Sequence, residues 1–205
     1  MNREAIENLP PITWLLLAAA IVFGWLLSAL WRWYREHRAR RAIVNAITSV
    51  GTDHLANVLV PDGMGGVFHI DFLLLTARGI IVIDLRDIRG NIFAGDQMNQ
   101  WTVMDGPQRA TFGNPQSALY DRIAAVKALA EDAPVEGRIV FTRRGKFPKG
   151  LPKWTLMIDS MRTEFPAVER EALANGGSPF AAVWANLKRS VAPSRLSQPR
   201  PAQGT

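Results

Sequence analysis

The longest run of hydrophobic positions lies near the start of the chain, over residues 12–31. These twenty positions, ITWLLLAAAIVFGWLLSALW, contain no charged residue. At a rise of about 1.5 Å per residue, a helix of this length matches a hydrocarbon core of about 30 Å. A cleaved signal peptide would have a basic start and a shorter apolar run, and this chain has neither. The pattern therefore predicts one transmembrane helix over 12–31.

The charges on the two sides of this run differ. Residues 32–41, RWYREHRARR, hold five arginines and one glutamate, whereas Arg3 is the only arginine or lysine ahead of the run. Because positive charge stays on the cytoplasmic side, we expect an outside N-terminus and a single pass through the cell (inner) membrane, with the rest of the chain cytoplasmic. Membrane lipid is then a partner, and the arginines would contact anionic headgroups. The absence of cysteine agrees with a reducing compartment.

Helical and strand-like spacings alternate after the basic segment. Apolar positions recur at helical spacing in 36–50, 115–130, 165–177 and 179–191. Between them lie short runs rich in Ile, Leu and Val, among them FHIDFLLL, IIVIDLR, GRIVFT and WTLMID. This interleaving predicts an α/β fold, with a mixed central sheet flanked by helices.

The predicted organisation has five parts. They are a short extracytoplasmic N-terminus (1–11), the transmembrane helix (12–31), a basic juxtamembrane segment (32–41), the α/β domain (42–191) and a disordered tail rich in proline, serine and glutamine (192–205). The net charge of +6 is modest once the juxtamembrane arginines are set aside, so charge alone says little about function.

Two strand-like runs each contain one aspartate, Asp71 and Asp84. A hairpin turn at Ala77-Arg78 would place these aspartates directly opposite each other, and a bulge would shift them by one residue. Two buried carboxylates at that distance repel, and three arrangements would relieve them: a shared proton, a cationic side chain or a divalent metal. Arg86 projects from the same strand face as Asp84 and could neutralise one carboxylate. An ion pair with Arg86 or Arg89 is thus one interpretation, and a Mg²⁺ site, with Mn²⁺ as a substitute, is the other.

The same stretch resembles the nuclease-related domain family, NERD, a branch of the restriction-endonuclease-like PD-(D/E)xK fold. Asp71 stands where the family has its first aspartate, GIIVIDLR covers the core strand, and Gly90 falls at the family glycine. The hairpin GNIFAGDQMNQW and the helix start Asn114-Pro115 follow in family order, so the resemblance covers about residues 40–145. It implies a restriction-endonuclease-like sheet, Mg²⁺ bound by Asp71 and Asp84, and cleavage of DNA or RNA by metal-activated water.

The chain also departs from the family pattern at the implied catalytic residues. Asp84 replaces a metal-binding glutamate, and Arg86 replaces a lysine that orients or activates the attacking water. Arginine does not readily give up a proton. Two functions therefore remain open for the set Asp71, Asp84 and Arg86. One is a membrane-anchored, Mg²⁺-dependent nuclease with a partly degenerate site, and the other is an inactive NERD-like module that binds nucleic acid or protein at the membrane.

A basic segment follows the last family strand. Residues 142–153, TRRGKFPKGLPK, contain five cations and no acid. We expect Arg143, Arg144 and Lys146 to contact a DNA or RNA backbone, and the alternative is a solvated loop. The three histidines are scattered and show no zinc-binding spacing.

Overall fold

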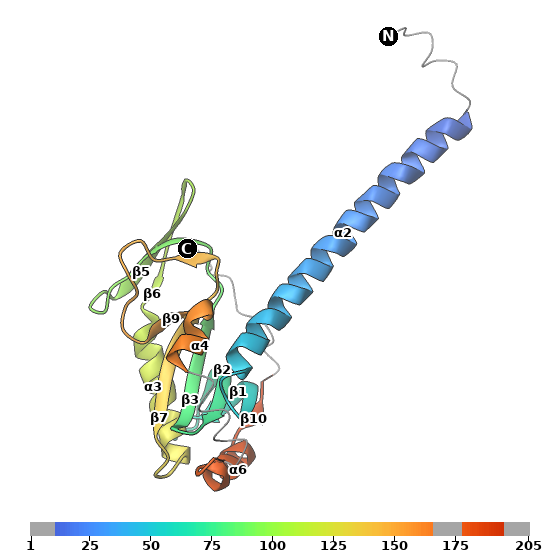
Figure 1. Ribbon diagram of the computed structural model, residues 1–205. Helices are drawn as coiled ribbons and strands as arrows, with labels where there is room; N and C mark the ends of the chain where they lie inside the picture. The colour runs from blue at the N-terminus through green and yellow to red at the C-terminus, as the bar shows by residue number, and fades with distance from the viewer. Residues whose placement is uncertain (1–10, 166–177, 195–205) are drawn as a thin grey trace. The chain divides into compact units, whose positions relative to one another are not determined.

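The computed structural model describes residues 11–165 and 178–194 (Figure 1). The helix predicted over 165–177 lies almost wholly outside the described residues, as do most of the N-terminal segment and the end of the tail. The chain divides into two compact units, residues 1–42 and 43–205.

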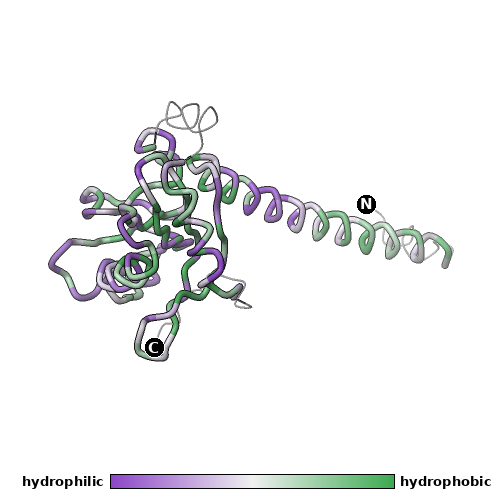
Figure 2. The backbone as a smooth tube through the Cα atoms, turned by 90° about the horizontal axis from the view of Figure 1, so that it is seen from below, coloured by the Kyte–Doolittle hydropathy of each residue, from purple (hydrophilic) through white to green (hydrophobic). Residues whose placement is uncertain are grey.

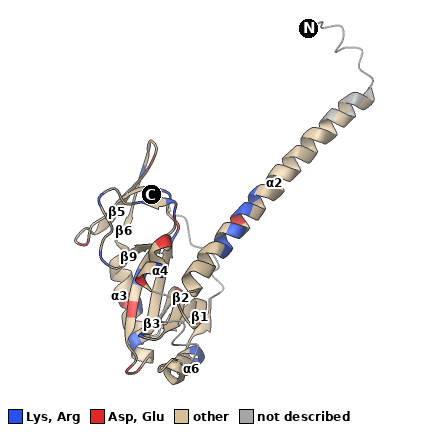
Figure 3. Ribbon diagram, in the orientation of Figure 1, with Lys and Arg blue, Asp and Glu red and all other residues tan. Residues whose placement is uncertain are grey.

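The first helix, α2 (Pro11–Thr48), is 38 residues long. It joins the predicted span, the basic segment and the helix predicted from residue 36 into one continuous element. Figure 2 shows it hydrophobic along its first part and hydrophilic further on, where Figure 3 shows its arginines. Among the residues that the structure describes, no helix combines the length and apolarity needed to cross a membrane. The transmembrane helix over 12–31 is therefore not confirmed and stays a prediction.

The unit formed by residues 43–205 contains a six-stranded sheet in the order β10-β1-β2-β3-β7-β9. The first four of these strands pair antiparallel, and β3, β7 and β9 pair parallel, so the predicted mixed sheet is confirmed. The strands are β1 (Asp53–Pro61), β2 (Val67–Thr76), β3 (Gly79–Arg86), β7 (Val135–Phe141), β9 (Thr155–Met157) and β10 (Ala192–Pro193). The last of them, β10, lies in the segment assigned to the disordered tail, yet it pairs with β1.

A second, four-stranded sheet has the order β6-β5-β4-β8. Its strands are β4 (Gly90–Phe93), β5 (Gln100–Asp105), β6 (Gln108–Gly113) and β8 (Gly145–Lys146). The sequence indicated β4 and β5, whereas β6 and β8 carry too few apolar residues to stand out. The indole of Trp101, on β5, is fully buried and stacks with Phe141 of the larger sheet at 6.3 Å between ring centroids. This contact joins the two sheets through the aromatic core.

Within the described residues, the sheets are accompanied by the helices α3 (Pro115–Leu129), α4 (Met161–Glu164) and α6 (Ala181–Ser190) and by the 3-10 helix η1 (Ile158–Ser160). The start predicted at Asn114-Pro115 is confirmed, because the Asn114 side chain accepts a hydrogen bond from the Gln116 N–H at 2.9 Å and caps α3. The helix lies against β7 (Figure 1). A Cβ at Gly137 would come within 2.5 Å of Ile123, so glycine permits this close packing. The strand predicted from WTLMID ends early, at Met157, where η1 begins.

The hairpin between β2 and β3 turns at the predicted dipeptide. Thr76 pairs with Gly79, which leaves Ala77 and Arg78 as the two turn residues. Gly79 has a φ of 136°, and a Cβ there would lie 2.1 Å from the Pro134 carbonyl oxygen. Only glycine fits both the backbone conformation and the space. The turn therefore fixes the register without a bulge.

The two faces of the sheet belong to different parts of the core. Ile80 and Val82 of β3 pack in the cluster that includes α3, whereas Ile81 and Ile83 pack in the cluster that includes Ile47 at the end of α2. Because side chains alternate along a strand, Asp84 shares the face of Ile80 and Val82. The same alternation on β2 places Asp71 with Leu73 and Leu75 in the α3 cluster. Both aspartates therefore project toward the α3 side.

Candidate functional site

Asp71 and Asp84 lie where the β2–β3 ladder ends. Its last pair is Phe72 with Ile83, and the next position in this register places Asp71 opposite Asp84. The Asp71 side chain interrupts the ladder there, because its Oδ2 accepts a hydrogen bond from the Leu85 N–H at 2.8 Å. The two aspartates are therefore on adjacent strands, as predicted.

Asp84 is the more buried of the two, with 4% of its side chain exposed. Its Oδ2 accepts hydrogen bonds from Arg86 Nη2 at 2.8 Å and from Arg122 Nη1 at 2.9 Å. Arg86 Nε lies 2.7 Å from Oδ1, although its hydrogen does not point at that oxygen. Asp84 is thus held by two guanidinium groups, one from its own strand and one from α3.

Arg122 also ties α3 to β2. Its Nε donates a hydrogen bond to the His69 carbonyl at 2.8 Å, while its Nη1 contacts Asp84. Arg122 was not among the site residues predicted from the sequence. The available signal was weak, because Arg122 only borders the apolar stripe of α3, and its partners are 38 and 53 residues away in the chain.

The electrostatics of the two aspartates differ. Burial raises the pKa of Asp71, the nearby charge of Asp84 raises it further, and the hydrogen bond from Leu85 N–H opposes both effects. Burial alone would lower the pKa of Arg86, but the charge and hydrogen bond of Asp84 outweigh it and raise that pKa. The guanidinium therefore stays charged beside Asp84, while Asp71 ionises less readily than an ordinary aspartate.

His69 is a second residue of the cluster that the sequence analysis missed. Its Nδ1 lies 3.7 Å from Asp71 Oδ1, and its Nε2 is buried without a hydrogen-bond partner among the described residues. A signal was present in the sequence, because residues two apart on a strand share one face. His69 therefore borders Asp71 with its side chain, while its carbonyl accepts the hydrogen bond from Arg122.

This set of donors does not fit a magnesium ion. Mg²⁺ needs carboxylate oxygens that are free to coordinate it. Asp84 directs its oxygens at two arginines, and Asp71 has one oxygen engaged by the Leu85 N–H. Within residues 11–165 and 178–194, no group of three or more His, Cys, Asp or Glu residues could hold a metal ion. Of the three arrangements considered for the two carboxylates, Asp84 has the cationic one, and the predicted Mg²⁺ site is not confirmed.

The structure also gives the partners of Arg89 and of the arginines in the basic segment. Arg89 pairs with Asp105 at 3.2 Å and not with either site aspartate. Arg143 pairs with Asp159 at 2.6 Å, and Arg144 pairs with Asp87 at 2.9 Å. The hydrogen bond from Arg143 lowers the pKa of Asp159.

Lys146 completes the predicted nucleic-acid contacts. It is exposed and has no ion-pair partner in the part of the chain that the structure describes. Both arginine side chains remain more than half exposed, at 79% for Arg143 and 58% for Arg144. The basic segment is therefore accessible, although two of its charges are partly compensated.

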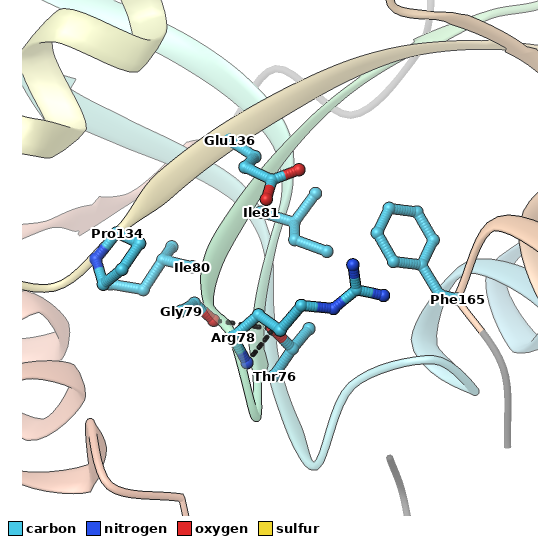
Figure 4. A pocket seen from close by; sticks show the side chains of 8 residues that line it. All are labelled: Thr76, Arg78, Gly79, Ile80, Ile81, Pro134, Glu136 and Phe165. Carbon is cyan, nitrogen blue, oxygen red and sulfur yellow. Dashed lines mark hydrogen bonds between the residues drawn. The ribbon is translucent and has the colours of Figure 1, made fainter. Parts of the chain in front are cut away.

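A small pocket lies at the other end of the hairpin. Figure 4 shows the side chain of Arg78 extending toward the ring of Phe165 there. The pocket is five residues along β2 and β3 from the two aspartates, about 16 Å at strand spacing, so it is separate from them. Its lining residues are Thr76, Arg78, Gly79, Ile80, Ile81, Pro134, Glu136 and Phe165.

A comparison with known protein families gives a match. A family model described as the nuclease-related domain matches residues 33–142, more than half of the chain. That range contains Asp71, Asp84, Arg86 and Arg122, and it ends where the basic segment begins. Comparisons with curated proteins and with solved structures give no match.

Proposed function

Because the chain belongs to the nuclease-related domain family, we propose that it is a membrane-anchored nuclease-related module that binds nucleic acid without cutting it. One observation carries the proposal: Asp84, at the position of the family's metal-binding glutamate, is held by Arg86 and Arg122. Metal-activated hydrolysis needs those oxygens on the metal. Arg86 also cannot serve as a proton-transfer group, because its guanidinium stays protonated.

Nucleic-acid binding is supported by the basic segment 142–153. Its five cations face no acid within the segment, and Arg143, Arg144 and Lys146 are exposed. Exposed cations bind phosphates by releasing counterions, so the expected binding is sensitive to salt and indifferent to base sequence.

Membrane attachment is supported by the first helix. The large apolar side chains with defined exposure between Ile12 and Tyr34 are at least half exposed, and those of Ile21 and Trp25 reach 70% and 71%. Apolar surface of that extent needs an apolar cover, and the arginines that follow it suit anionic headgroups. Arg35 lies over the Trp31 ring at 4.8 Å, an arrangement that suits the interface between lipid and water.

The catalytic part of the proposal is tested with the full chain reconstituted in lipid nanodiscs. Labelled DNA and RNA are incubated with Mg²⁺ or Mn²⁺, and both cleavage and binding are measured. We expect binding that weakens with salt and no cleavage. The variant R86K restores the family's lysine, and we expect it to remain inactive because Arg122 still holds Asp84. Metal-dependent cleavage by the wild type, lost in D84N, would overturn the proposal.

A metal-dependent nuclease is the second candidate, and one observation favours it. Asp71 and Asp84 lie close enough for the charge of Asp84 to raise the pKa of Asp71, which is the repulsion that a bound cation would relieve. Cleavage by R86K but not by the wild type would indicate a nuclease that the arginine substitution has silenced.

The membrane part is tested separately by fractionation and proteolysis of cells. We expect extraction of the chain by detergent and not by high salt or alkali, and protection of the C-terminal domain from protease added to intact cells. Removal of that domain by the external protease would reverse the proposed orientation, and release by salt would exclude a transmembrane anchor.

A further inference from the structure

Trp154 presents an indole to solvent from a fixed position beside β9. Its side chain is 40% exposed, whereas Trp101 and Trp184 of the same domain are buried. Its backbone has a φ of 54°, a left-handed conformation that a bulky residue adopts only when its surroundings impose it.

Hydrogen bonds on both sides of Trp154 supply that constraint. The buried amide of Gln116 donates to the Lys153 carbonyl at 2.9 Å and to Asp96 Oδ1 at 2.9 Å. The same Oδ1 accepts the Lys153 N–H at 2.9 Å, and the Trp154 carbonyl accepts the Ile139 N–H at 2.8 Å. These hydrogen bonds therefore fix the backbone that carries the exposed indole of Trp154.

A second aromatic ring stands beside it. Tyr120, on α3, packs edge to face with Trp154 at 4.7 Å between ring centroids and an interplanar angle of 84°. Tyr120 is itself 50% exposed. The contact uses one edge and one face of the two rings, and both residues keep part of their surface open to solvent.

This aromatic pair lies next to positive charge and near the nuclease-related site. Lys153 precedes Trp154 directly and closes the basic segment 142–153. Asp84 pairs with Ile139, and Ile139 pairs with Thr155, the residue after Trp154. Two strand spacings, roughly 10 Å, therefore separate the Trp154 edge of the sheet from Asp84.

We propose that Tyr120 and Trp154 form a stacking platform for single-stranded nucleic acid, with the lysines of the basic segment on its phosphates. This inference rests on the proposed nucleic-acid binding and adds the class of ligand. Rigid exposed rings beside cations bind unpaired bases, whose faces are free, whereas the bases of a duplex are already stacked. A lipid surface is the competing occupant, because exposed Trp and Tyr rings also favour the interface between lipid and water, and the test includes it as an outcome.

The test measures fluorescence anisotropy of a labelled oligo-dT and of a duplex of equal length, with the full chain in zwitterionic nanodiscs. We expect W154L to weaken oligo-dT binding about tenfold, W154F to retain most of it, and duplex binding to be unchanged by either. K146A should weaken both ligands and reduce the salt dependence, while K127A, an exposed lysine on α3, should weaken neither.

The outcomes separate the inference from the function on which it rests. Equal loss of oligo-dT and duplex in W154L, or no loss in a W154L protein whose thermal melting matches the wild type, would overturn the platform. If the wild type binds neither ligand even at low salt, the proposed nucleic-acid function fails and the platform fails with it. In nanodiscs containing phosphatidylserine, the affinity for oligo-dT should be unchanged. Loss of the W154L effect in these nanodiscs would assign the rings to lipid.

Discussion

Two carboxylates hold helices onto the six-stranded sheet, and they do so in different surroundings. Asp84, on a central strand, is 4% exposed and engages Arg86 and Arg122, which joins α3 to the sheet. Asp53, at the start of β1, is 41% exposed and accepts hydrogen bonds from Trp184 and Lys188, which join α6 to the sheet. The pattern of donors is similar, but the degree of burial decides what each contact contributes.

The difference also concerns charge balance. Around Asp53 the ammonium of Lys188 and one carboxylate compensate each other at the surface, where water screens both. Around Asp84 two partly buried guanidinium groups face a single carboxylate, and the nearby Asp71 ionises less readily than an ordinary aspartate. Removing Asp84 would therefore leave both guanidinium groups without their carboxylate partner, whereas Asp71 forms no ion pair with either of them.

The largest effect is expected from D84A. Removing this carboxylate leaves two arginines without their buried partner, and such a loss costs about 3–5 kcal/mol. Urea unfolding of the full chain in detergent would measure it. D132A, at an exposed position after α3, is the matched control and should change the free energy of unfolding by less than about 0.5 kcal/mol. Equal, small effects of D84A and D132A would remove the distinction between buried and exposed carboxylates.

A smaller loss is expected from D53N, about 0.5–1 kcal/mol, because water screens this half-exposed ion pair. Burial alone would raise the pKa of Asp53, but hydrogen bonds from Lys188 and Trp184 outweigh it and lower the pKa. A lowered carboxyl pKa gives stability that is complete above the ordinary value near 4 and is lost as the pH falls through the folded value. Unfolding measured from pH 7 to pH 3 should therefore show the wild type and D53N converging in acid. A gap that widened in acid would contradict this assignment.

The smallest effect is expected from D71N, and its sign is opposite. Burial and the charge of Asp84 raise the pKa of Asp71, so the ionised group costs stability at neutral pH. An asparagine oxygen can still accept the Leu85 N–H, so D71N should unfold slightly later than the wild type at pH 7. Because a raised pKa is a cost only when the group ionises, the advantage should vanish as the pH falls below the folded value. Destabilisation at pH 7 would show that the arginines neutralise Asp71 as well.

The part of this cluster that lies within one hairpin could be predicted from the sequence. The alternating Ile, Leu and Val residues and the glycine after Arg78 define the turn, and the turn then sets Asp71 opposite Asp84. The contact of Arg86 with Asp84 follows from their spacing of two residues on one strand. Such inferences need only local geometry.

The remainder depended on contacts between distant segments. Arg122 reaches Asp84 only because α3 docks across the sheet, and Gly137 sets how closely it docks. Docking of distant segments also determines the pairing of Ala192 and Pro193 with β1. It likewise determines the hydrogen bond from Gln116 that fixes the backbone beside Trp154. Local propensity contains little information about such contacts. The sequence therefore left the choice between a cation and a metal at Asp84 open.

That choice is tested most directly by the thermal melting of the full chain with and without divalent metal. A ligand that binds only the folded state raises the melting temperature by mass action. Because Arg86 and Arg122 hold Asp84, we predict that millimolar Mg²⁺ or Mn²⁺ leaves the melting temperature where NaCl of equal ionic strength leaves it. A rise with Mg²⁺ or Mn²⁺ that NaCl does not reproduce, and that D84N or D71N abolishes, would contradict the arginine-held site and restore the metal centre.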